Sequence, residues 1–234
     1  MKTLGLIGGM SWESTAHYYS RINQLVAERL GGLHSAQLLL YSVEFDVLQK
    51  LQHSDDWAGA ARVLVDAARR LQHGGAEGLV ICANTMHLVA PEIEAAVKLP
   101  LIHVADATAE AIKRHDIRRV ALLGTRFTME KDFYRRRLEQ RHNLQVMIPG
   151  GAERQAIHRI IFDELCRGEV RPVSRDVFFK IIARLAAAGA EGVILGCTEF
   201  TLFGESKAAD IPLFDTTEIH AHAAVDWALD GSRS

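Results

Sequence analysis

The sequence has few of the features that mark membrane or nucleic-acid-binding proteins. No apolar run approaches the roughly 20 residues that a membrane-spanning helix needs, so we expect no membrane span. Lysine and arginine together number 27, against 29 aspartates and glutamates, and no basic stripe occurs. The charge therefore gives no electrostatic footprint for nucleic acid. With 234 residues and 48% apolar content, the chain is long enough for one sizeable core or two smaller ones.

Cysteine is also scarce. Cys82, Cys166 and Cys197 are odd in number and widely spaced, which suits reduced thiols in a cytoplasmic protein better than a disulfide framework. No CxxC or HExxH occurs and the eleven histidines are scattered, so we expect no metal site. The first residues, MKTLGLIGGMSW, carry one lysine and pass quickly into a glycine turn, which predicts a first strand and not a signal peptide.

Strand-like and helical patterns alternate along the chain. Apolar runs predict strands, and Ala-rich or amphipathic stretches predict helices between them, with Gly74-Gly75 ending one helix. This alternation predicts the α/β class with parallel sheets. We expect the final GSRS (231–234) to be disordered. In the first half the expected strands are 4–9, 36–45, 78–83 and 99–104, and the expected helices are 14–30, 57–75, 91–98 and a last one reaching about residue 115.

The second half of the sequence repeats the first. RRVALLGT (118–125) resembles KTLGLIGG (2–9), AAAGAEGVILGCT (186–198) resembles QHGGAEGLVICAN (72–84), and IPLFDTTEIHAHAA (211–224) resembles LPLIHVADATAEAI (99–112). Three matches in the same order, with offsets of about 116, 114 and 112, indicate a duplication. The repeat predicts two pseudo-symmetric α/β halves of about 115 residues each.

Polar residues follow the predicted strands, where parallel sheets bind ligands. The segments are GGMSWES (8–14), ANTMH (83–87), GTRFTME (124–130) and CTEF (197–200). Helices after these loops would offer backbone N–H groups to a carboxylate or phosphate. LGLIGGMSW does not match GxGxxG, which argues against a dinucleotide site. The polar side chains placed there are Ser11, Asn84, Thr85, Thr125, Thr128 and Thr198.

Cys197 is the cysteine most suited to chemistry. It follows Gly196 at a strand end and precedes a Thr-Glu pair that opens a predicted helix, whose N-terminus would lower the thiol pKa. Cys82 lies inside an apolar strand and Cys166 near a helix end, so packing roles are expected for both. Other polar residues of these segments also have structural explanations. Asn84 and Thr85 are ordinary helix-capping types, His87 is more typical of structure than catalysis, and Glu199 is either a first-turn charge or a partner of the thiol.

Six segments together resemble the cofactor-independent aspartate/glutamate racemase family, and within it the broad-specificity amino-acid racemases of enteric bacteria. The resemblance spans nearly the whole chain. Its carriers are LGLIGGMSWEST (4–15), LGGLHSAQLLLYSV (30–43), ICANTMH (81–87), VALLGTRFTMEKDFYR (120–135), IIFDELC (160–166) and VILGCTEF (193–200).

The resemblance implies two α/β domains with the active site between them. It also implies that the C-terminal strand and helix return to the first domain and that the segment near 99–115 packs in the second. The expected boundaries are 1–98 plus 209–234 for the first domain and 99–208 for the second. The family needs no cofactor, pyridoxal phosphate included, and its members are often dimers, so a homodimer is a further expectation.

The family's reaction removes the α-proton of an amino acid and returns a proton to the other face, which requires a group on each face. The resemblance places one thiol at Cys197. The partner position, immediately before Asn-Thr, is occupied here by Ala83, which has no proton to transfer. Cys82 should point away from that face, because successive side chains in a strand alternate. Implied substrate contacts are Met10, Gln52, Asn84 and Thr85, with Glu164 less directly.

Ala83 leaves four hypotheses open. The first is a racemase in which Cys197 works with a substitute, such as water or His87, at low activity. The second is that Ala83 is an engineered change that disables the enzyme. The third is a one-thiol decarboxylase or isomerase that protonates one face only. The fourth is a binding protein for a small acid that has lost catalysis. The substrate side chain is not fixed, but a close, ionised Glu164 would repel the distal carboxylate of aspartate or glutamate, which favours broader specificity.

Overall fold

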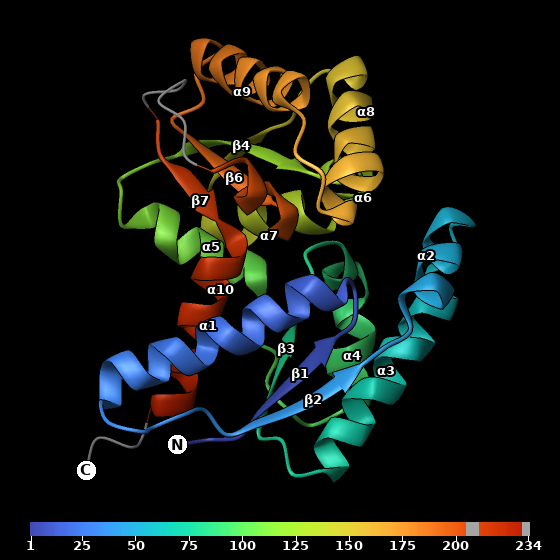
Figure 1. Ribbon diagram of the computed structural model, residues 1–234, viewed down its shortest axis with the longest axis vertical. Helices are drawn as coiled ribbons and strands as arrows, with labels where there is room; N and C mark the ends of the chain where they lie inside the picture. Colours follow the sequence, from blue (N-terminus) through green and yellow to red (C-terminus); the bar gives the residue numbers. More distant parts are fainter. Residues whose placement is uncertain (205–210, 231–234) are drawn as a thin grey trace. The chain divides into compact units, whose positions relative to one another are not determined.

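The computed structural model describes residues 1–204 and 211–230, so the final GSRS lies outside the described residues. The chain divides into two compact units (Figure 1). Unit 1 comprises Met1–Val104 and His220–Ser234, and unit 2 comprises Ala105–Ile219. Each unit contains a sheet whose described strand pairs are all parallel, which confirms the predicted α/β class.

Unit 1 is built on a three-stranded sheet of order β2-β1-β3. Its register pairs Leu4 with Leu38 on one side and with Gly78 on the other. The strands are short and almost wholly buried in the centre, as expected where helices cover both faces of a parallel sheet. They are β1 (Leu4–Gly8), β2 (Leu38–Ser42) and β3 (Gly78–Ile81).

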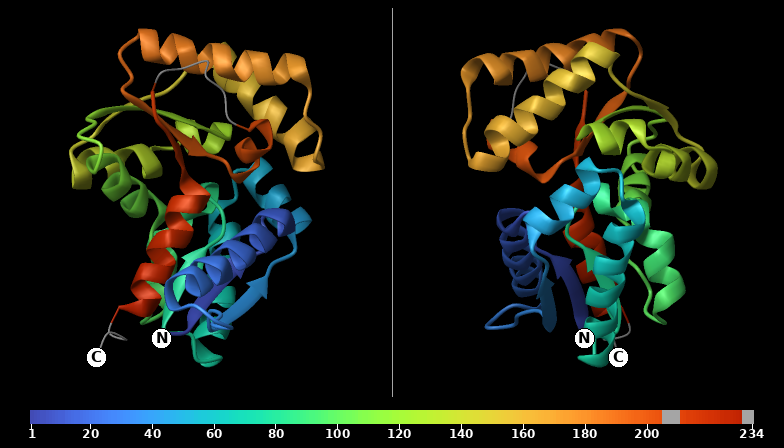
Figure 2. Two further views of the ribbon diagram at one scale, coloured as in Figure 1. Left: turned by 60° about the vertical axis from the view of Figure 1, so that its left-hand side comes forward. Right: turned by 90° about the vertical axis from the view of Figure 1, so that its right-hand side faces the viewer.

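Helices cover both faces of this sheet (Figure 2, right). One core joins Ile7 and Ile81 to apolar residues of α2, α3 and α4, and the other joins Leu6 and Val80 to α1 and α10. The alternation of β1 and β3 side chains between these two cores is the two-residue period of a strand. The helical elements are α1 (Trp12–Leu30), α2 (Phe45–His53), α3 (Trp57–His73), the 3₁₀ turn η1 (Thr85–Val89), α4 (Ala90–Ala96) and α10 (Thr216–Leu229).

Unit 2 contains a four-stranded sheet of order β5-β4-β6-β7. Its main core joins Leu123 and Val193 to the aromatic and aliphatic side chains of α8 and α9. Both views in Figure 2 place these two helices over the same face of the sheet. The strands are β4 (Arg119–Gly124), β5 (Gln145–Met147), β6 (Gly192–Gly196) and β7 (Leu213–Asp215).

The helical elements of unit 2 include a π-helical turn, η2 (Ile160–Glu164), which continues α8 directly. Such single π turns are rare in proteins, and those that occur are often found at functional sites. The remaining elements are α5 (Val104–Lys113), α6 (Arg126–Glu130), α7 (Asp132–His142), α8 (Gly151–Arg159), the 3₁₀ turns η3 (Leu165–Arg167) and η4 (Thr198–Phe203), and α9 (Pro172–Ala187).

The internal repeat predicted from the sequence is confirmed by equivalent hydrogen bonds. In unit 1 the Leu79 N–H donates to the Pro100 carbonyl at 2.9 Å, and in unit 2 Val193 donates to Pro212 at 2.9 Å. Their neighbours Glu77 and Glu191 also make matching backbone bonds, each of 2.8 Å, to the residue that precedes or opens the central strand. The two units therefore share the same strand connections at a shift of about 112 to 116 residues.

The unit boundaries follow from strand pairing. Leu101 bridges Leu79, and the Ile102 N–H donates to the Leu79 carbonyl, so residues 99–103 belong to unit 1. Strand β7 pairs with β6, so the expected return of the C-terminal strand to the first domain is wrong, and only α10 from His220 onward belongs to unit 1. The sequence-based boundaries are 98/99 and 208/209, whereas the structure divides the chain at 104/105 and 219/220. Residue 209 itself lies outside the described residues.

Two local expectations also need correction. The strand-like run 36–45 is strand only over β2, because the Glu44 carboxylate caps a new helix, α2, by accepting from the Asp46 and Val47 N–H groups. The expected strand 99–104 is reduced to a single bridge at Leu101. Across the described residues, no helix combines the length and apolar character needed to cross a membrane.

Candidate functional site

The loops after β1 and β3 in unit 1 carry the predicted residues Met10, Asn84 and Thr85. β1 and β3 are neighbours, with Ile7 paired to Ile81, so both loops leave the same edge of the sheet. Met10 and Asn84 are buried and Thr85 is half-buried. The Asn84 side chain makes no capping hydrogen bond to the 3₁₀ turn that follows, so helix capping does not account for it.

Cys82 and Ala83 belong to opposite sides of the unit 1 sheet. Cys82 is fully buried in the core with Tyr18 and Val80, whereas Ala83 packs against the core that contains Ile81. Burial also raises the pKa of the Cys82 thiol far above its ordinary value. Cys82 is therefore a packing residue, as predicted, and it does not present a thiol where Ala83 lies.

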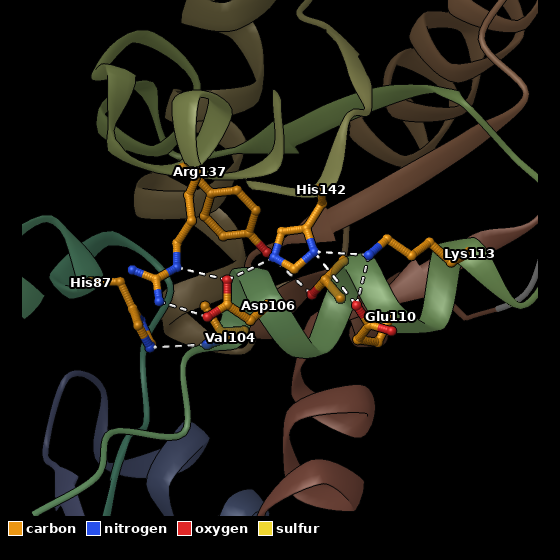
Figure 3. Close-up of polar contacts among 9 residues, drawn as sticks. His87, Val104, Asp106, Glu110, Lys113, Arg137 and His142 are labelled. Carbon is orange, nitrogen blue, oxygen red and sulfur yellow. Dashed lines mark hydrogen bonds and ion pairs between the residues drawn. The ribbon is translucent and has the colours of Figure 1, made fainter. Parts of the chain in front are cut away.

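His87 is held by backbone groups at both ring nitrogens. Nδ1 lies 2.8 Å from the Ala83 carbonyl oxygen, and Nε2 accepts from the Val104 N–H at 3.3 Å (Figure 3). A carbonyl can only accept, so the ring proton resides on Nδ1. His87 is buried, and its ring lies 4.5 Å from that of His103, centroid to centroid. This geometry supports the structural role expected of His87.

Another buried histidine, His220, adjoins His87, with ring centroids 5.6 Å apart. Its Nε2 lies 2.6 Å from the Ile102 carbonyl and its Nδ1 lies 3.0 Å from the Tyr18 hydroxyl. Burial lowers the pKa of His220 to about 4. This histidine is therefore neutral at physiological pH and fixes α10 to the core of unit 1.

The loops after β4 and β6 in unit 2 carry Thr125, Cys197 and Thr198. Gly124 pairs with Gly196 in the sheet, which places Thr125 and Cys197 directly beyond a matched pair of strand ends. Both glycines allow close approach, because a Cβ on Gly196 would lie 2.8 Å from the Leu123 carbonyl oxygen. Strand register therefore brings these predicted residues together.

Thr125 has a structural twin in Ser11 of unit 1. The Thr125 hydroxyl accepts from the Thr128 N–H at 3.2 Å, and the Ser11 hydroxyl accepts from the Ser14 N–H at 3.3 Å. Each is the N-cap of the helix that follows the central strand of its unit. The repeat thus preserves the shape of these loops as well as the strands.

Cys197 has a carboxylate as its immediate partner. Its thiol donates to Glu199 Oε2 at 2.9 Å, and the Thr198 hydroxyl donates to the same oxygen at 2.6 Å. Cys197 itself is buried, with extended backbone at the start of η4. Of the two roles considered for Glu199, the geometry favours that of partner to the thiol.

The expected activation of Cys197 by a helix N-terminus is wrong. Burial raises the pKa of the thiol well above its ordinary value, and the neighbouring Glu199 charge raises it further. The element that follows is a 3₁₀ turn of six residues, and its dipole does not offset these two effects. Cys197 is therefore a thiol, not a thiolate, at neutral pH.

Gln52 and Glu164 are the two implied side-chain contacts that come from helices. Gln52 lies on α2, is buried, and points its Nε2 at the Met86 sulfur 3.0 Å away. Glu164 ends the π-helical turn, is also buried, and accepts from the Ser174 hydroxyl at 2.9 Å. Ser174 was not identified from the sequence, because no local pattern links the start of α9 to a carboxylate ten residues earlier.

A further charged cluster in unit 2 ties α5 to α7 (Figure 3). Arg137 donates to both Asp106 oxygens, at 2.7 and 2.6 Å, and His142 Nε2 lies 2.9 Å from Oδ1. Burial alone would raise the pKa of Asp106, but the hydrogen bonds from Arg137 and His142 outweigh it and lower that pKa. All acceptors of this cluster are engaged, so we assign it a structural role.

The fold belongs to the parallel α/β class, and in each unit polar loops follow two neighbouring strands at the carboxyl end of the sheet, where such folds bind ligands. The family profile for Asp/Glu/hydantoin racemases matches residues 7–224. The chain therefore belongs to that family, and membership supports a racemase function.

Individual relatives agree. The chain is 20% identical over 231 residues to the broad specificity amino-acid racemase RacX of Bacillus subtilis, covering 97% of this chain and 98% of that protein. A crystal structure from Yersinia pestis is similar at 54% identity and a TM-score of 0.92, over 98% of this chain and 100% of that one. An aspartate racemase homologue from Pyrococcus horikoshii is similar at 35% identity and a TM-score of 0.84, over 97% and 99% of the two chains.

Proposed function

We propose that the chain is a pyridoxal-phosphate-independent amino-acid racemase in which Cys197 exchanges the α-proton on one face of the substrate. The observation that carries this proposal is the buried hydrogen bond from the Cys197 thiol to Glu199. It supplies a proton donor and a proton acceptor 2.9 Å apart at the end of a strand. Position 83, the repeat equivalent of Cys197, serves the other face.

The raised pKa of Cys197 sets its resting role. As a thiol it donates its proton to the α-carbanion and becomes a thiolate. In the reverse direction the thiol proton first moves to Glu199, and the thiolate then takes the α-proton. That transfer leaves the total charge of the pair unchanged, which matters where burial penalises any added charge.

The substrate carboxylate must be held firmly, because a weakly acidic C–H demands positioning and stabilisation of charge. We assign this task to the loop amides and to the side chains of Met10, Asn84, Thr85 and Thr125. Thr198 has a different task in this proposal. Its hydroxyl donates to Glu199, so it orients the carboxylate that receives the thiol proton.

Ala83 limits the second half of the reaction. It provides no proton, Cys82 belongs to the opposite core, and His87 has both nitrogens on backbone groups. Of the two substitutes considered, water or His87, this favours water. We therefore expect fast exchange on the Cys197 face and slow inversion.

The test is incubation of the L- and D-enantiomers of an amino-acid panel, including aspartate, glutamate and homoserine, with the protein in D₂O. Mass spectrometry follows α-deuteration and chiral chromatography follows inversion. We expect deuteration with largely retained configuration of the enantiomer whose α-proton Cys197 exchanges, and a much slower appearance of the opposite enantiomer. Binding without any deuteration would contradict the proposal and favour the non-catalytic binding protein.

A second function is favoured by the same thiol. A protonated Cys197 in a chain that has no acid at position 83 suits an enzyme that protonates one face of a carbanion formed by loss of CO₂. In such a reaction the C–C bond to a carboxylate breaks, CO₂ leaves, and the thiol proton joins the carbon. Release of CO₂ from α-carboxylated acids, without α-deuteration of amino acids, would select this decarboxylase.

A further inference from the structure

One oxygen of Glu164 has its hydrogen-bonding capacity unused. The side chain belongs to a residue only 8% exposed, and Oε1 accepts from the Ser174 hydroxyl at 2.9 Å. Oε2 is shielded from solvent and has no hydrogen-bond partner within residues 1–204 and 211–230. A shielded carboxylate oxygen without a donor is costly, so folds keep such groups where function supplies the donor.

Glu164 belongs to the same packed region as Cys197. The next residue, Leu165, lies in the unit 2 core cluster that includes Cys197, and η3 packs against η4. Arg175, on the helix that also carries Ser174, donates to the Phe203 carbonyl at the end of η4 at 2.9 Å. The carboxylate and the thiol therefore stand on neighbouring elements of one unit.

The charges around Glu164 do not suit a substrate with an acidic side chain. Its nearest cation, Arg171, lies 3.8 Å from Oε1, is 60% exposed, and donates to Glu169 at 2.7 Å. It is thus already shared between two carboxylates and screened by water. Gln52, the other implied contact that lies on a helix, is neutral, and none of the implied contacts is a cation that would balance a distal carboxylate of the substrate.

We infer that Glu164 selects amino acids whose side chain ends in a hydrogen-bond donor, which Oε2 accepts. This inference rests on the proposed function. An ammonium group is the strongest such donor, because it pairs with the charge as well as the lone pair. A hydroxyl or amide N–H also satisfies the oxygen. A distal carboxylate or a methyl group leaves Oε2 unsatisfied or repelled.

The test compares α-deuteration in D₂O of isosteric substrates by wild type and Glu164→Gln. Ornithine and norleucine differ only by an ammonium in place of a methyl group, and homoserine and norvaline differ by a hydroxyl. We expect wild type to exchange ornithine at least about tenfold faster than norleucine, and Glu164→Gln to reduce this ratio about tenfold. Ser174→Ala should reduce it less, because the carboxylate stays but is less well oriented.

Glu169→Gln is the matched control, since it also alters a carboxylate bound to Arg171, and it should leave the ornithine-to-norleucine ratio unchanged. An unchanged ratio in Glu164→Gln would overturn the inference. So would selective loss of glutamate exchange in Arg171→Gln, which would assign side-chain recognition to the arginine. If wild type deuterates no amino acid, the proposed function fails by itself. Calorimetric binding of ornithine against norleucine then still decides whether Glu164 discriminates.

Discussion

The Cys197 thiol lies 2.9 Å from Glu199 Oε2 and donates its proton to that carboxylate. The same carboxylate oxygen also accepts from the Thr198 hydroxyl. The three consecutive residues 197–199 therefore form one hydrogen-bonded group. Burial and the Glu199 charge keep the proton on sulfur by raising the thiol pKa. The pair therefore combines a proton donor, the thiol, with a proton acceptor, the carboxylate. Exchange of an α-proton requires such a group on the face of the substrate where it occurs.

Replacing Cys197 should remove the exchange activity. Cys197→Ser leaves a hydroxyl whose pKa is far too high to exchange an α-proton, so we expect α-deuteration to fall by at least about a thousandfold. Mass spectrometry of amino acids incubated in D₂O measures it. Cys82→Ala is the control, because the Cys82 thiol is buried in a core of unit 1 that does not contain Ala83. This variant should keep the exchange rate while losing some thermal stability. A normal exchange rate in Cys197→Ser would show that this thiol does not exchange the α-proton.

Removing the Glu199 charge should make Cys197 ionise at lower pH. The charge and the hydrogen bond of Glu199 both raise the thiol pKa, so Glu199→Gln should shift the pH profile of Cys197 alkylation to lower pH. The exposed Glu94→Gln is the control. The measurement is the rate of iodoacetamide labelling of the Cys197 peptide across a pH series. The same variant should lose α-deuteration, because the proton acceptor is gone, and an unshifted profile would show that Glu199 does not control the thiol.

A thiol at position 83 should restore inversion. Ala83→Cys places a proton donor at the repeat equivalent of Cys197, and we expect the D-enantiomer to appear at about the rate of α-deuteration. Chiral chromatography measures the two rates in one sample. Ala83→Val is the matched control, because it adds bulk without a proton and should leave inversion slow. If Ala83→Cys and Ala83→Thr both leave inversion unchanged, residue 83 does not face the substrate.

Acid should destabilise unit 1 through His220. The folded pKa is about 4 and the ordinary value is 6.5, so the unfolded chain binds more protons between these values. The stabilising contribution is therefore fully present above pH 6.5 and is lost as the pH falls toward 4, amounting to about 3 kcal/mol. Urea unfolding at pH 7, 6, 5 and 4 measures it. His220→Gln should show a smaller acid slope, with exposed His17→Gln as the matched control, and an equal slope would assign the acid sensitivity elsewhere.

The close approach of β4 and β6 should not tolerate a side chain at Gly196. A Cβ there would lie 2.8 Å from the Leu123 carbonyl oxygen, and backbone cannot move aside as a side chain can. Gly196→Ala should lower the unfolding free energy by about 1–3 kcal/mol and displace Cys197. Gly151→Ala, whose Cβ meets nothing nearer than 3.9 Å, should cause no loss. Thermal unfolding of both variants checks this, and equal melting temperatures would contradict the packing argument.

The repeat explains why much of the fold followed from local pattern. Leu79 and Val193 are 114 residues apart and make the same backbone bond to a proline carbonyl, because both copies keep the same apolar strand and the same Ile/Leu-Pro sequence after it. The capping residues Ser11 and Thr125 recur for the same reason. Helix α2 escaped prediction because its start depends on the Glu44 cap at the end of a strand-like run.

The sequence by itself determined the α/β class, the duplication, the family, and the mismatch between Cys197 and Ala83, because each depends on residue type and spacing along the chain. Only the tertiary structure decided the ionisation of Cys197, the partner of Glu164, and the unit to which β7 belongs. These three depend on burial and on contacts between residues that are distant or oriented in space. A helix-start pattern predicted a thiolate, but burial and the Glu199 carboxylate outweigh the effect of a short helical turn. The sequence offered Glu199 as a possible partner, whereas the burial of the thiol and the hydrogen bond between the two groups follow only from the fold.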